Sequence, residues 1–161
     1  MNPIASAVYP HMSRLAVNAP AEGLKFLRRQ VRLTGGLFLV ISIGLWVFAP
    51  LVVSLLYGPR FSETAALLRL MSPTPFVHAI SVCFGTYFML AYGHEKVWMK
   101  IMTRTVILNF VLLGLLILVT TPLRAVALTT TLIDVYSAAA AISFFRRTTR
   151  SGVQARPAAV S

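Results

Sequence analysis

The chain has 161 residues, of which 57% are hydrophobic and 12% are charged, and its formal net charge is +11. One soluble core of this length could not bury so much apolar surface, so the composition excludes an ordinary soluble domain. The basic residues flank apolar stretches and do not form a continuous stripe with interleaved aromatic residues. This arrangement excludes a nucleic-acid partner and favours membrane lipids.

Residues 1–32 precede the first long apolar stretch. Residues 1–19 are too polar and too rich in proline to span a membrane, and they lack the basic start and apolar core of a signal peptide. They are interpreted as the cytoplasmic end of a preceding helix. Residues 21–32 carry Leu24, Leu27 and Val31 at helical spacing against basic residues, which predicts a basic amphipathic helix on the cytoplasmic surface.

Residues 33–145 contain four apolar stretches, each close to the roughly 20 residues that a membrane-spanning helix needs. The predicted spans are 33–56, 71–92, 101–121 and 123–145. A short helix at 61–70 is expected between the first two spans, an inner loop at 94–104 follows the second, and Pro122 forces a tight hairpin between the last two. Residues 146–161 are expected to be a basic, disordered cytoplasmic tail.

The fifteen Lys and Arg residues alternate between the gaps around these spans in the order 5, 2, 3, 1 and 4. Basic residues are enriched in cytoplasmic segments of membrane proteins. The alternation therefore predicts an all-α integral membrane protein with four transmembrane helices and both termini in the cytoplasm.

Asp134 lies midway in the last predicted span. An ionised carboxylate there costs at least about 2.5 kcal/mol and needs a partner, water or a proton. Small and hydroxyl residues share its helical face: Ala127, Thr130, Thr131, Ser137, Ala138 and Ala141. Asp134, Thr130 and Thr131 are therefore candidates to line a transport path, as a proton or cation site or as a contact for a headgroup in transit. The alternative is an interhelical hydrogen bond that fixes packing.

His78 shows the same pattern in the second span, where it shares a face with Thr74, Pro75, Ser81 and Gly85. A histidine that faces a cavity could relay protons, and the alternative is a packed hydrogen-bonding side chain. Asn109 in the third span is a further cavity candidate, with an interhelical amide hydrogen bond as its alternative.

Arg60, Arg69 and Arg124 lie at the outer ends of the spans and are candidates to contact anionic headgroups. The sequence offers no catalytic residues, no metal ligands and no cofactor motif. It has no paired carboxylates, no nucleophile and base at recognisable spacing, no glycine-rich phosphate loop and no His/Cys cluster. An enzyme is not expected.

Three motifs occur in an order that resembles a known family. The first is Ala7 to Leu15, similar to a "P-x-x-S-x-L" helix end, and the second is Leu55 to Phe61 with Ala65 to Leu70, Pro73 and Pro75 after it. The third is Leu90 to Lys96, similar to an inner "G-x-x-K" turn. Together they resemble the C-terminal half of Wzx-like polysaccharide flippases, of the multidrug/oligosaccharidyl-lipid/polysaccharide exporter superfamily.

The resemblance implies a larger fold of twelve or more helices in two lobes, to which this chain contributes the last four spans. It implies that undecaprenyl-diphosphate-linked oligosaccharide is moved across the bacterial inner membrane for surface polysaccharide biosynthesis. The expected partners are membrane lipids, the lipid-linked oligosaccharide, and either the missing N-terminal lobe or a second subunit. The sequence departs from the pattern of this family in two ways. The first lobe is absent, which suggests a fragment, and the turn at 121–126 lacks the glycines that many members have.

Two other functions fit the residues. Four spans with one intramembrane carboxylate also describe a small exporter that works as a homodimer. A third hypothesis is a non-transporting scaffold subunit of a polysaccharide assembly complex.

Overall fold

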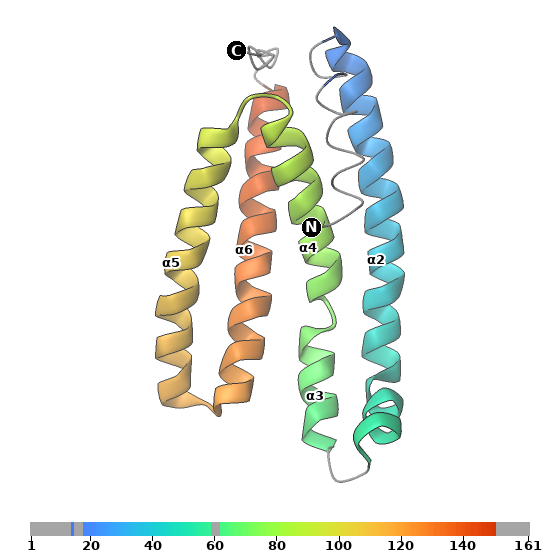
Figure 1. Cartoon of the computed structure of the whole chain (residues 1–161), viewed down its shortest axis with the longest axis vertical. Helices are drawn as coiled ribbons and strands as arrows, with labels where there is room; N and C mark the ends of the chain where they lie inside the picture. The colour runs from blue at the N-terminus through green and yellow to red at the C-terminus, as the bar shows by residue number, and fades with distance from the viewer. Residues whose placement is uncertain (1–13, 15–17, 59–61, 151–161) are drawn as a thin grey trace.

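The computed structural model describes residue 14, residues 18–58 and residues 62–150. The described residues form only helices, which are shown in Figure 1. They are α2 (Pro20–Tyr57), α3 (Ser62–Met71), α4 (Thr74–Val82), the π-helix η2 (Cys83–Leu90), α5 (Glu95–Val119) and α6 (Pro122–Arg150). The predicted helix end within residues 1–19 lies largely outside the described residues.

Four helical stretches are long and apolar enough to cross a membrane: Ala21–Tyr57, Glu63–Leu90, Glu95–Val119 and Pro122–Thr149. This result confirms the all-α class for the described residues and the expected number of helices that could cross a membrane. In Figure 1 the start of α2 and the end of α6 lie at the same end of the bundle, as an even number of crossings requires. The side of the membrane on which this end lies stays a prediction.

The first two spans differ from the predicted ranges. The amphipathic segment at 21–32 and the span at 33–56 form one continuous helix, α2. The predicted span at 71–92 is shorter, because it consists of α4 and η2, which follow one another without a gap from Thr74 to Leu90, and the short helix expected at 61–70 is α3. Pro73 and Pro75 lack the N–H groups that would continue α3 into α4. The hydroxyl of Ser72 donates to the Arg69 carbonyl oxygen at 2.7 Å and so satisfies this acceptor at the end of α3.

The last two spans are longer than predicted. The inner loop expected at 94–104 is wrong, because α5 already begins at Glu95 with this carboxylate in its first turn, where the helix dipole favours negative charge. The connection shrinks to residues 91–94. The disordered tail expected from residue 146 is likewise wrong for residues 146–150, which continue α6, while residues 151–161 lie outside the described part.

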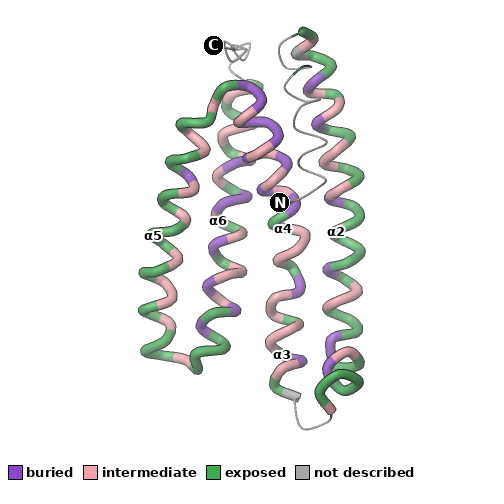
Figure 2. The backbone as a smooth tube through the Cα atoms, in the orientation of Figure 1, coloured by how far each residue is buried: buried purple, intermediate pink, exposed green. Residues whose placement is uncertain are grey.

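The bundle is ordered around α6, which packs between α5 and α4, while α2 packs on α3 and α4. The best-buried large side chains gather where η2 meets the start of α5 and the last turns of α6, at the end of the bundle shown at the top of Figure 2. The ring of Phe88 packs edge-to-face on that of Phe145, with centroids 4.9 Å apart. Elsewhere α2 and α5 expose large apolar side chains, as helices in contact with lipid do.

Gly85 permits the closest approach in this core. A Cβ at position 85 would overlap the six-membered ring of the Trp98 indole, which lies directly on the glycine backbone. The glycine therefore lets η2 and α5 pack together at the turn that joins them.

Pro50 lies inside α2 and leaves one carbonyl oxygen of the helix without its usual partner. A residue at position 50 would normally donate its N–H to the oxygen of Trp46, but proline has no N–H. Arg69 on α3 takes this place: its Nε donates to the Trp46 oxygen at 3.3 Å, and its guanidinium lies 5.8 Å from the centroid of the Trp46 ring. Arg69 thus joins α3 to α2 at the point where proline interrupts the α2 hydrogen bonds.

This arrangement predicts a coupling between Arg69 and Pro50. Arg69→Gln should lower the free energy of unfolding by about 1 kcal/mol, because the Trp46 oxygen loses a charged donor. In a Pro50→Ala background the same substitution should have less than half that effect, since the N–H of the introduced alanine restores the helical hydrogen bond. Thermal unfolding of the four proteins in detergent measures the difference, and equal losses in both backgrounds would contradict the assignment.

Candidate functional site

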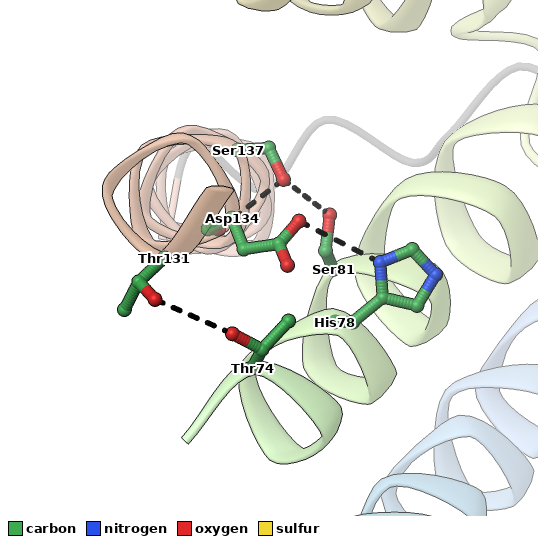
Figure 3. Close-up of polar contacts among 6 residues, drawn as sticks. All are labelled: Thr74, His78, Ser81, Thr131, Asp134 and Ser137. Carbon is green, nitrogen blue, oxygen red and sulfur yellow. Dashed lines mark hydrogen bonds and ion pairs between the residues drawn. The ribbon is translucent and has the colours of Figure 1, made fainter. Parts of the chain in front are cut away.

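A row of polar side chains lies between α4 and α6 (Figure 3). The two helices run in the same direction, so residues separated by 56 or 57 positions face one another. Three pairs result, one from each turn: Thr74 with Thr131, His78 with Asp134, and Ser81 with Ser137. We call these six residues the polar row.

The pairs differ in geometry. The hydroxyl oxygens of Ser81 and Ser137 are 2.7 Å apart and both residues are buried, whereas those of Thr74 and Thr131 are 3.5 Å apart. Between them, Nδ1 of His78 lies 3.6 Å from Oδ1 of Asp134. The structure therefore brings together the two residues that the sequence singled out separately.

The local sequence explains why the row forms. Its members recur at steps of three or four on α4 and of three on α6, so each set lies on one helical face. Small side chains border the row on α6, where Ala127, Ala138 and Ala141 are buried, and Ala79 is buried on α4. Small residues let helix backbones approach closely enough for short hydroxyl groups to meet.

Burial falls from the serine pair towards the ion pair. Asp134 exposes 19% of its side chain, but His78 exposes 66%. An imidazole and a carboxylate are unfavourable against lipid, so this edge of α4 needs water or further protein beside it. Such a pair can share a proton or hold a small cation.

The other predicted residues stand apart from this row. The hydroxyl of Thr130 donates to the Val126 carbonyl oxygen of its own helix at 2.9 Å. Asn109 is half-buried on α5, and Arg124 is exposed in the first turn of α6. Arg60 lies outside the described residues. Arg69 contacts Trp46. The sequence did not predict this contact, because only the tertiary fold places α3 against the Pro50 region of α2.

No metal centre is evident in the described part of the chain, where no three His, Cys, Asp or Glu side chains gather. Cys83 is buried there as a free thiol.

A second histidine lies outside the spans, in the turn between η2 and α5. The ring of His94 packs at 5.1 Å from that of Phe144 and at 6.3 Å from that of Phe88. Its Nε2 is buried without a hydrogen-bond partner among the described residues. This burial lowers the pKa of His94 below its ordinary value, because the charged form would lose its hydration.

The lowered pKa predicts acid sensitivity. Folding favours the neutral form of His94, so its contribution to stability is complete above the ordinary histidine pKa of about 6.5 and declines as pH falls below it. The melting temperature of the wild type should therefore drop between pH 7 and pH 5 by more than that of His94→Gln, which cannot titrate at this position. Parallel pH curves for the two proteins in detergent would contradict this prediction.

Together, the four helices and the intramembrane ion pair define a multi-pass membrane protein with a polar site between two of its spans. The chain is 28% identical over 117 residues to a protein of Escherichia coli (strain K12) named "Putative O-antigen transporter". The match covers 70% of this chain and 27% of that protein, so the chain spans about a quarter of the length of this relative. No family model matches the chain, and no solved structure does. This distant homology confirms the resemblance to Wzx-like flippases.

Proposed function

We propose that this chain is the C-terminal part of a lipid-linked oligosaccharide flippase of the bacterial cytoplasmic membrane. The protein would move undecaprenyl-diphosphate-linked repeat units from the inner to the outer leaflet during surface polysaccharide biosynthesis. Its homology to an O-antigen transporter and the alternation of basic residues between the gaps support this proposal.

The His78–Asp134 pair is the observation that carries a transport role. Intramembrane ionisable pairs mark ion and proton pathways in membrane proteins. In this proposal Asp134 and His78 exchange a proton or cation as the transporter changes conformation. The serine and threonine pairs on either side keep α4 and α6 in register, so that the carboxylate and imidazole stay within reach of each other.

The exposure of the His78 side chain supports the proposal that further protein packs beside α4. In the complete transporter this edge of α4 would face a polar cavity closed by the N-terminal lobe or by a second subunit. Water in that cavity would supply and remove the transported ion, and lipid would contact the apolar faces of α2 and α5.

The test uses a bacterial strain from which the gene in its full reading frame has been deleted. We expect lipid-linked repeat units to accumulate and surface polymer to be lost, and both effects to be reversed when the gene is restored. Unchanged surface polymer and unchanged pools of lipid-linked intermediates in the deletion strain would refute the proposal. Expression of only residues 1–161 in the deletion strain tests the homodimeric exporter. Of the hypotheses considered, this is the one that predicts recovery of surface polymer from this chain without further protein.

A further inference from the structure

Two arginines border an apolar cavity at the end of the bundle where α6 ends. Arg28 and Arg32 on α2 lie one helical turn apart, and the cavity beside them has a volume of about 310 Å³. Its other walls are Leu27 and Val31 of α2, Phe84 of η2 and Phe145 of α6. The rings of Phe84 and Phe145 pack together with centroids 4.9 Å apart, so the cavity has an aromatic wall opposite the arginines.

The two arginines lack an acidic partner in the described part of the chain. The one ion pair there joins His78 and Asp134, so no described carboxylate lies within 4.0 Å of the Arg28 or Arg32 guanidinium. Residues 28 and 32 on the same helix present their side chains about 5–6 Å apart, close enough for both to contact one phosphate group. The charged edge of the cavity therefore offers an anion site.

The apolar walls require a ligand with a chain. Cavities lined by leucine and phenylalanine stay dry and bind apolar molecules, so a free phosphate would leave these walls uncovered. Arg32 directly precedes Leu33, where the continuous apolar stretch of α2 begins, and Arg28 lies one turn before Arg32. A phosphate at this depth with an acyl chain below it is the arrangement of a phospholipid at a membrane surface, and basic pockets between membrane helices on the cytoplasmic side bind such headgroups.

We propose that this cavity binds an anionic phospholipid of the inner leaflet, with its phosphate on Arg28 and Arg32 and an acyl chain against Phe84 and Phe145. The assignment to the inner leaflet rests on the orientation in the proposed function. The bound lipid would join α2 to η2 and α6 at the end of the bundle that holds the buried aromatic core.

The experiment measures phosphatidylglycerol binding to the full chain in detergent by native mass spectrometry. Arg28→Gln/Arg32→Gln should weaken binding about 20- to 30-fold, because each basic residue near the headgroup contributes about 1 kcal/mol. Lys25→Gln/Arg29→Gln is the matched control. It removes the same charge from exposed positions of the same helix that do not border the cavity, and should weaken binding less than about threefold.

Three outcomes would overturn the site. Equal losses of phosphatidylglycerol binding in the two double variants would show that general charge attraction, and not this cavity, binds the lipid. Equally tight binding of glycerophosphoglycerol, which has no acyl chains, would show that the apolar walls do not contribute. Displacement of phosphatidylglycerol by much lower concentrations of undecaprenyl diphosphate would make this a substrate site instead. Because no transport is measured, failure of the lipid site leaves the proposed flippase function standing, and failure of the deletion test leaves the binding result standing.

Discussion

Asp134→Asn should reduce export of surface polymer at least tenfold when the full-length gene carrying it replaces the wild type. Asparagine has nearly the shape of aspartate but can neither bind nor release a proton and carries no charge for a cation. The polar row would keep its serine and threonine pairs, which lie one turn to either side. The loss should therefore concern ion exchange and not folding.

Two controls separate transport from packing. The melting temperature of Asp134→Asn should equal or exceed that of the wild type, because a carboxylate within the membrane is costly to desolvate. Thr130→Val, whose hydroxyl is bonded within its own helix, should leave export within about twofold. Normal export by Asp134→Asn would assign this residue to interhelical packing, which is the alternative that the sequence left open.

Gly85→Ala should be the most destabilising small substitution among the described glycines. The new methyl group would overlap the Trp98 indole. The residues that follow Gly85 on η2, Tyr87, Phe88 and Met89, are buried, so this part of the helix cannot shift easily. Overpacking of a core costs about 1–3 kcal/mol, and overlap with a rigid ring places the expected loss near the upper value. Thermal unfolding in detergent measures the effect.

Gly114→Ala is the matched control, because nothing lies within 4 Å of a Cβ at that position on α5. Alanine should there be neutral or stabilise the helix by up to about 1 kcal/mol. Trp98→Leu should restore much of the stability of Gly85→Ala, since it removes the ring that the methyl group meets. A loss in Gly85→Ala no larger than that in Gly114→Ala would show that η2 and α5 are not in close contact.

Much of the membrane architecture could be predicted from residue type and order. The number of spans follows from apolar length, and the shared helical faces of Asp134 and His78 follow from the helical period. Boundaries were less predictable. The sequence pattern marks where apolar residues stop, but helices continue into polar segments such as 95–100 and 146–150, where the backbone hydrogen bonds remain favourable outside the apolar region.

The sequence by itself determined the class of protein and the polar face of each span, because hydropathy and helical period act locally. Only the tertiary structure decided which faces meet. It paired His78 with Asp134 through the parallel packing of α4 and α6, and Arg69 with the oxygen that Pro50 leaves free. It also placed Phe84 and Phe145 opposite Arg28 and Arg32. These contacts join residues 23 to 117 positions apart, and no local property of the chain specifies them.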